Sequence, residues 1–352
     1  MKKSFLHTLG PGLLFAGAAI GVSHLVQSTR AGAEFGFGLI WAILLVHIFK
    51  YPFFQFGPRY AAATGKSLLE GYKKMGKGVL IAYFFVNFVT MFIVQAAVTI
   101  VTASLASQLF GFTTDLVLWS TIITCISIFI LLFGKYKLLD NLMKYIIIIL
   151  TISTVVAVII ALFKNENAII ITQILPKGTV EITFLIAFLG WMPAPLDISI
   201  WHSIWAVEKN KLSTNKIKPK EAIADFNIGY IGALFMGVCF IMLGALVMFN
   251  SGEVFSDKGT VFASQLINLY TENLGEFSHI FIASAAFTTM FSTTITTLDA
   301  SPRAMNLSSE LLFGKKYKFG YWFWIFFLFV GTFIILQFYR ADMGNLINIA
   351  TI

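Results

Sequence analysis

The chain has 352 residues, of which 58% are hydrophobic, 16% aromatic and only 12% charged. Because about 25% of the residues of a soluble domain are charged, this composition excludes a disordered tail, a coiled coil and an ordinary soluble enzyme. Two cysteines, Cys125 and Cys239, are too few for a disulfide framework or a structural zinc site. The formal net charge of +8 would suit a nucleic-acid partner, but the placement of the charges indicates a lipid bilayer and no nucleic-acid surface.

Nine apolar stretches are each long enough to cross a bilayer, whose hydrocarbon core needs about 20 helical residues. They lack the alternation of period two that membrane barrel strands show, so helices are predicted. In chain order the stretches are 9–29, 37–57, 79–108, 116–134, 142–163, 181–204, 228–249, 277–299 and 320–338. A cleaved signal peptide is the alternative reading of the first stretch, but the later spans favour a polytopic membrane protein.

The lysines and arginines predict the orientation, because cytoplasmic loops of membrane proteins are enriched in them. With the N-terminus in the cytoplasm, 19 of these cations fall on the inner side and five on the outer side. The inner set is Lys2, Lys3, Arg59, Lys66, Lys73, Lys74, Lys77, Lys135, Lys137, Lys144, Lys209, Lys211, Lys216, Lys218, Lys220, Arg303, Lys315, Lys316 and Lys318. The outer set is Arg30, Lys164, Lys177, Lys258 and Arg340, and Lys50 lies inside a span. We therefore expect a cytoplasmic N-terminus in a plasma-membrane protein.

The loops between the spans are short, so no separate soluble domain is expected. The outer loop 250–276 is predicted to be solvated, although 261–270 could form a helix along the surface. A tenth helix is predicted to start at Met343 and would extend only about 15 Å. We therefore expect a shortened version of a longer parent, in which Asn345 and Asn348 line a cavity.

Residues that break helices lie inside two of the spans. Span one contains Gly21, followed by polar residues, and span six contains Pro193 and Pro195. Proline lacks an N–H group and disfavours a helical residue before it, and irregular backbone within a membrane survives only where it lines a cavity. Interrupted helices at corresponding positions of two halves indicate a transporter built from inverted repeats, with its site at the midplane. Two ordinary kinked helices are the alternative.

Polar side chains near the two breaks are the candidate site residues, because such groups are costly in a membrane. His24 is either a ligand or a hydrogen-bonded packing histidine, and Asp197 either faces the site or lies in a cytoplasmic vestibule as a proton or exit-path group. Lys50 is expected to snorkel to the interface, and Asp299 and Arg303, four residues apart, to form an ion pair.

Gln27 of span one and the hydroxyls of span eight form a second group of candidates. Thr289 and Thr293 could glue helices together or line a cation path, and both roles stay open at this point. Together with the residues at the breaks, they define a predicted pathway through the protein.

Four sequence segments resemble the Nramp family of proton-coupled divalent metal transporters. They are 10–12 (Gly-Pro-Gly), 31–41 with its Ala-Gly-Ala-Glu-Phe-Gly-Phe run, 63–68 (Ala-Thr-Gly-Lys-Ser-Leu) and the Met-Pro pair at 192–193. The resemblance implies an all-α polytopic membrane protein with the fold of the amino acid–polyamine–organocation superfamily, made of two inverted repeats of five helices. We predict one transmembrane domain, with a first repeat at 1–163 and an incomplete second repeat at 181–352.

The chain departs from the family pattern at the binding motifs. Where the family has Asp-Pro-Gly-Asn in helix one, residues 21–24 read Gly-Val-Ser-His, so the carboxylate ligand is absent. In helix six Met192 carries over, but Ala194 and Pro195 follow Pro193 and Ser199 replaces a histidine. The resemblance therefore implies a divergent branch.

Residues at the two breaks are predicted to form the substrate site. It comprises Gly21, Ser23, His24, Met192, Ala194 and Asp197. Imidazole, thioether and freed carbonyl groups suit transition metals, so His24 and Met192 are the expected metal ligands.

The predicted function is secondary active transport of a divalent transition-metal cation such as manganese or iron, with proton coupling left open. The alternatives are a non-metal small solute in the same fold and a truncated chain that does not transport. No resident cofactor is expected. No pair of a nucleophile and a base indicates an enzyme.

Overall fold

The computed structural model describes residues 10–165, 169–212, 216–249, 255–256, 258–275, 279–338 and 343–350. Within these ranges the regular backbone is entirely helical. In chain order the elements are α1 (Pro11–Ala19), the π-helix η2 (Val22–Ser28), α2 (Thr29–Phe35), α3 (Ile40–Thr64), α4 (Leu68–Met75), α5 (Lys77–Phe110), α6 (Leu116–Lys164), α7 (Thr179–Trp191), α8 (Asp197–Leu212), α9 (Pro219–Val247), α10 (Gly259–Leu274), α11 (His279–Phe313), α12 (Gly320–Phe338) and α13 (Met343–Ile349).

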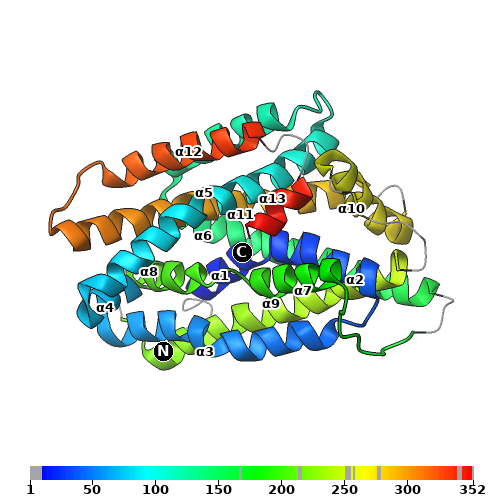
Figure 1. Ribbon diagram of the computed structural model, residues 1–352, viewed down its shortest axis with the longest axis horizontal. Coiled ribbons are helices and arrows are strands. Elements are labelled where there is room, and N and C mark those ends of the chain that lie inside the picture. The colour runs from blue at the N-terminus through cyan, green and yellow to red at the C-terminus, as the bar shows by residue number, and fades with distance from the viewer. Residues whose placement is uncertain are drawn as a thin grey trace, which may run out of the picture.

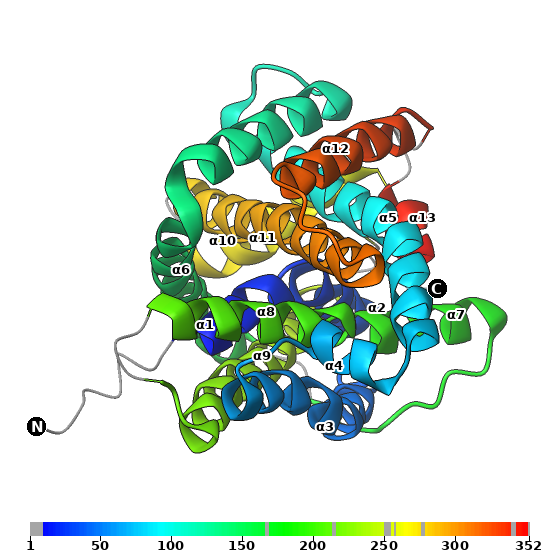
Figure 2. The same ribbon diagram turned by 90° about the vertical axis from the view of Figure 1, so that its left-hand side faces the viewer.

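The interrupted helices occupy the middle of the molecule. α3 and α9 pack on one side of them, and α5, α11 and α12 lie on the other side (Figure 1; Figure 2). The predicted breaks in spans one and six are both confirmed, because α1 is separated from η2 and α7 from α8. This arrangement places the two interruptions against each other in the interior.

The lengths and compositions of the helices agree with a multi-pass membrane protein. Six segments of the described chain are long and apolar enough to cross a bilayer, and two shorter apolar helices accompany them. The six are Pro11–Phe35, Ile40–Thr64, Lys77–Phe110, Ile147–Lys164, Pro219–Val247 and Gly320–Phe338; the shorter ones are Leu116–Leu132 and Thr179–Trp191. α11, which coincides with the predicted span 277–299, is not among them, and a row of hydroxyl side chains runs along it.

Two predictions about loops are wrong. The loop expected between the spans 116–134 and 142–163 is helical, because both spans fall on α6. Gly134 is the only strong helix breaker near residues 135–141, so the local sequence does not end the helix there. The solvated loop expected at 250–276 contains α10, whose Phe262 and Leu266 are buried against the bundle; the helix considered for 261–270 is present.

Two glycine contacts hold both halves of the first broken helix against α9. A Cβ atom on Gly229 would lie 2.0 Å from the carbonyl oxygen of Gly12, and one on Gly244 would lie 2.2 Å from that of Thr29. Real Cβ atoms essentially never come that close to a carbonyl oxygen. The backbones of α1 and α2 therefore touch the backbone of α9 directly, one on each side of the break.

A buried carboxylate caps the start of α1. Asp225 of α9 is 3% exposed and accepts hydrogen bonds from the backbone N–H groups of Gly10, at 3.1 Å, and Gly12, at 2.7 Å. The first N–H groups of a helix have no partner within the helix and carry partial positive charge. Asp225 thus supplies the acceptor and the charge that this helix end requires.

Polar contacts connect α11 with α5 on the other side of the breaks. The hydroxyls of Thr102 and Thr294 are 2.8 Å apart, and Thr297 donates to Gln95 Oε1 at 2.7 Å. Within α11 itself, the predicted ion pair is present, with Arg303 Nε 2.7 Å from Asp299 Oδ2. These contacts leave few hydroxyls of α11 free of a packing partner.

Candidate substrate site at the two helix breaks

The break in helix one occurs at Ile20 and Gly21. α1 ends at Ala19, and η2 resumes at Val22 with the wider turns of a π-helix. A Cβ atom on Gly21 would lie 2.8 Å from Thr293 Oγ1 on α11, so no side chain fits there without displacing Thr293. Gly21 therefore permits the close approach of the break to α11.

The break in helix six extends from Met192 to Leu196. α7 ends at Trp191, and α8 begins at Asp197. The segment contains Pro193 and Pro195, whose missing N–H groups and fixed φ angles oppose a continuous helix. The two prolines that predicted this break from the sequence therefore also explain it in the structure.

The carbonyl groups at the end of α7 are not free, contrary to the prediction of freed carbonyl ligands. The ammonium group of Lys50, from α3, lies 2.8 Å from the carbonyl oxygens of Leu189, Gly190 and Met192, and 3.5 Å from that of Ala194. The prediction that Lys50 snorkels to the interface is wrong, because its ammonium group contacts these carbonyl oxygens instead.

His24 is enclosed between the break and α9. Its Nε2 lies 2.9 Å from the carbonyl oxygen of Ala233. Its Nδ1 lies 2.6 Å from Ser23 Oγ and 3.0 Å from the carbonyl oxygen of Ala19. The imidazole is fully buried and both nitrogens have partners; in this conformation His24 is a packing histidine.

Met192 lies in a different environment from His24. Its side chain is buried in an apolar cluster with Phe188 of α7 and Ile241 of α9. Its sulfur lies 3.8 Å from Ser28 Oγ, which donates to it. The two expected metal ligands therefore have different neighbours, and the structure does not bring them together around one cavity.

Asp197 directly follows the break in helix six, whereas Gln27 lies six residues beyond Gly21, in η2. Asp197 is half-buried at the first position of α8, where it interacts electrostatically with Tyr72 and Tyr83. Gln27 is fully buried in η2, and neither polar atom of its side chain has a hydrogen-bond partner among the described residues. Gln27 is thus a buried amide that a polar guest could satisfy.

A small cavity lies between the breaks, with a volume of about 20 Å³. Its walls come from helix one, helix six, α5, α8 and α11. The lining residues are Ala18, Ala19, Val22, Ser23, Val94, Val98, Trp191, Pro195, Ile198, Trp201, Thr293 and Thr297. Of the predicted site residues, only Ser23 and Thr293 line it; Thr289 instead donates to the carbonyl of Ala285 in its own helix.

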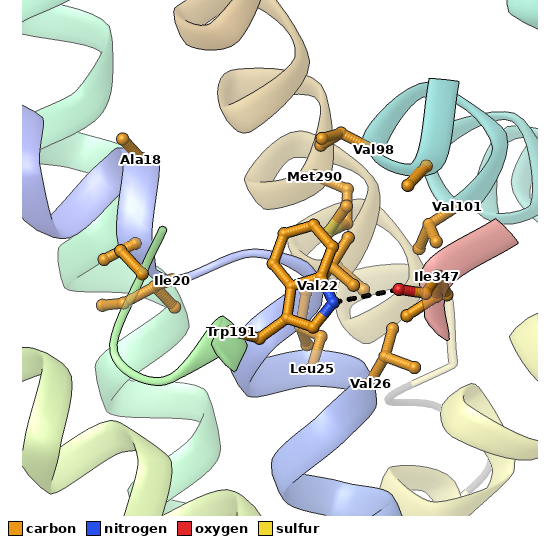
Figure 3. Packing of buried hydrophobic residues seen from close by; sticks show 14 of the residues in the cluster. Ala18, Ile20, Val22, Leu25, Val26, Val98, Val101, Trp191, Met290 and Ile347 are labelled. Carbon is orange, nitrogen blue, oxygen red and sulfur yellow. Dashed lines mark hydrogen bonds between the residues drawn. The ribbon is translucent and has the colours of Figure 1, made fainter. Parts of the chain in front are cut away.

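α13 contacts Trp191, one of the residues that line the cavity. The indole of Trp191, at the end of α7, donates to the carbonyl oxygen of Ile347 at 3.2 Å (Figure 3). In the same view this ring lies beside Val22 and Leu25 of helix one, with Met290 of α11 above it. Asn345 of α13 is exposed and does not line this cavity, contrary to the prediction. The same prediction for residue 348 concerns a side chain outside the described ones.

The donor set around the cavity is poor in strong metal ligands. Within the described part of the chain, no three His, Cys, Asp or Glu side chains come together in a way that could hold a metal ion. The polar side chains of the cavity wall are the hydroxyls of Ser23, Thr293 and Thr297 and the indoles of Trp191 and Trp201. Thr293 also donates to Gly17 O at 3.2 Å. Hydroxyls and carbonyls suit hard cations or a polar solute better than soft metals.

The role of Asp225 was not predicted from the sequence, and Lys50 was predicted to have a different environment, although both residues had a visible signal. Asp225 is an acid three residues before the predicted span 228–249, and Lys50 is a base within the predicted span 37–57. Charged groups at such places are rare and are usually paired. Their partners are backbone groups at the start of α1 and at the end of α7, which cannot be identified from residue types.

Comparison with known proteins identifies the family. A family model described as natural resistance-associated macrophage protein-like, Nramp, matches residues 12–352. The uncharacterised protein PM0681 of Pasteurella multocida is 40% identical over 324 residues, which cover 90% of this chain and 74% of that protein.

Solved structures share the fold at low sequence identity. A manganese transporter of Eremococcus coleocola matches with a TM-score of 0.74 and 15% identity, over 99% of this chain and 76% of that one. Mhp1, a nucleobase-cation-symport-1 family transporter, matches with a TM-score of 0.67 and 17% identity, over 97% of this chain and 75% of that one. The predicted inverted-repeat fold is thereby confirmed, and the match over residues 12–352 shows that the chain belongs to the Nramp family.

Proposed function

We propose that this protein is a secondary active transporter that moves a divalent transition-metal cation across the membrane. Two observations support the proposal: membership of the Nramp family, and the meeting of both helix breaks at one buried cavity. The second observation carries it, because opposed breaks at mid-span are where transporters of this architecture bind their cargo. No enzymatic activity is part of the proposal.

His24 and Met192 remain the proposed ligands, but both must move to act. The imidazole of His24 would leave Ala233 O, and the thioether of Met192 would leave Ser28 Oγ. Imidazole and thioether favour the softer transition metals. Binding would therefore accompany a rearrangement of η2 and of the break in helix six.

The carbonyl of Met192 is a poor ligand while Lys50 stays in place. A divalent ion on that oxygen would be at most about 5 Å from the Lys50 ammonium, which costs roughly 7 kcal/mol at an effective dielectric constant of about 20. The metal is therefore proposed to bind on the side of the cavity formed by Ser23 and Thr293, away from Lys50.

The proposed topology has the N-terminus in the cytoplasm of the cell and proton coupling as an open part of the mechanism. The arrangement of basic residues supports it. α4, α8 and the connection between α11 and α12 all lie towards the left end of the molecule in Figure 1. The lysines of these segments are Lys73, Lys74, Lys209, Lys211, Lys315, Lys316 and Lys318. Such a basic end suits the anionic inner leaflet.

A non-metal small solute is the second candidate. It is favoured by the cavity wall, whose described residues combine the indoles of Trp191 and Trp201 with hydroxyls and include no carboxylate. A cation would keep most of its charge unneutralised there, which is costly. A neutral or weakly polar solute would not meet this cost.

Metal binding by the purified protein tests the proposal directly. Calorimetric titration with Mn²⁺ is expected to give saturable binding, weakened at least about 10-fold by His24→Ala and by Met192→Ala. The matched controls are His279→Ala and Met75→Ala, two exposed positions that should leave binding unchanged. Uptake into proteoliposomes over a panel of metals gives the second measurement. Absence of Mn²⁺ binding, or equal binding by all four variants, would replace the metal with a non-metal solute.

A further inference from the structure

A positively charged side chain from α3 caps the end of α7. The last carbonyl groups of a helix have no partner within it and carry partial negative charge. Here the ammonium of Lys50 is 2.8 Å from three of these carbonyl oxygens, those of Leu189, Gly190 and Met192. These oxygens belong to residues 139 to 142 positions away in the sequence.

The geometry fixes the charge of Lys50. A protonated lysine has three N–H bonds, whereas a neutral amine has two. Three acceptor oxygens at the same short distance therefore match an ammonium group, with the carbonyl of Ala194 at 3.5 Å as a more distant fourth oxygen. The cluster of oxygens surrounds the charge as a cation site would.

Carbonyls at the end of a half-helix are groups that coordinate free cations in transporters with broken helices. In this chain the position is filled by a cation that is covalently part of the protein. An exchangeable ion and the Lys50 ammonium cannot occupy it together, because both need the same oxygens.

We propose that Lys50 is a tethered cation that holds the break of helix six in its open shape and connects α7 to α3. The same helix α3 also holds the second half of helix six. Ser199 of α8 donates to the carbonyl of Phe53 at 2.8 Å, and a Cβ on Gly57 would lie 2.3 Å from the Ser199 carbonyl oxygen. α3 therefore fixes both sides of the break. This role does not depend on the identity of the cargo.

Chemical rescue separates a cation site from simple loss of packing. Lys50→Ala removes the stem beyond Cβ together with the ammonium, and propylammonium replaces the atoms removed. The melting temperature of the purified variant is expected to fall and to recover saturably with propylammonium. Tetramethylammonium has the same charge but no N–H donor, so at equal ionic strength it should give no recovery.

Two further variants complete the test. Lys50→Met keeps an unbranched side chain without charge and should melt below the wild type, insensitive to propylammonium. Lys66→Ala, at an exposed position, should match the wild type under all conditions. If Lys50→Ala cannot be purified alone, recovery of folded protein from cells grown with propylammonium replaces the melting measurement. Recovery by tetramethylammonium equal to that by propylammonium, no recovery by either, or a Lys50→Met protein as stable as the wild type would each overturn the proposal. None of these measurements requires metal binding, so they are independent of the proposed cargo.

Discussion

The contact between α1 and α9 leads to a prediction whose size follows from the structure. In Gly229→Ala the new Cβ would lie 2.0 Å from the carbonyl oxygen of Gly12 and 2.8 Å from its carbonyl carbon. Ordinary contact begins near 3.4 Å, so the two backbones must separate by about 1.4 Å in a densely packed interior. Because both partners are backbone atoms, no side-chain rotation can relieve the clash. Overpacking of this kind costs about 1–3 kcal/mol.

The matched control lies on the same helix, one turn away. A Cβ on Gly232 meets nothing within 4 Å, and alanine favours a helix over glycine by about 1 kcal/mol. Thermal melting of the two purified variants in detergent gives the comparison, at about 2–4 °C for each kcal/mol in large domains. Gly229→Ala should melt below the wild type and Gly232→Ala at or above it. Equal melting temperatures for the two variants would refute the reasoning from direct backbone contact.

Two other predictions use the same melting measurement. Asp225→Asn removes the charge that binds two N–H groups at the start of α1, and should lower the stability by about 1–3 kcal/mol. Asp115→Asn, at an exposed helix start where both residues cap well, should have little effect, and an equal loss in both would contradict the role of burial. Tyr321→Phe removes the hydroxyl that donates to Asp299 at 2.5 Å and should cost about 1–3 kcal/mol. Tyr317→Phe, at a residue that is 42% exposed, should leave the melting temperature unchanged. If Tyr317→Phe lowers the melting temperature as much as Tyr321→Phe does, the contact with Asp299 is not the cause of the loss.

The sequence predicted the helices and their breaks well because both depend on local chemistry. Gly21 and the closely spaced Pro193 and Pro195 disfavour a regular helix, so the interruptions could be placed within a few residues. A single proline is a weaker signal, since α3 and α11 continue through Pro52 and Pro302. The prediction of a loop between the spans 116–134 and 142–163 was wrong because the local sequence there does not oppose a helix. Residues 135–141 are Lys-Tyr-Lys-Leu-Leu-Asp-Asn, which contain neither glycine nor proline, and the helix continues through them. The repeat boundaries at 1–163 and 181–352 stay a prediction.

The site could be predicted only in part because its contacts are made at long range. His24 stands out as polar within an apolar span, but its Nε2 partner, Ala233 O, lies 209 residues later. Lys50 finds backbone oxygens of Leu189 to Met192, which carry no mark in the sequence. Residue type alone reveals that such a group needs a partner, while the fold decides whether the partner is a metal, a solute or the protein itself.

The cavity between the breaks limits the size of what this conformation can enclose. Its volume of about 20 Å³ is close to the space that one water molecule needs, whereas a hydrated octahedral ion such as Mg²⁺ holds about six waters. A cation enclosed here would have lost nearly all of its hydration shell beforehand. Dehydration would then be an early filter in selection, and Mg²⁺, which gives up its waters reluctantly, would be the most strongly rejected.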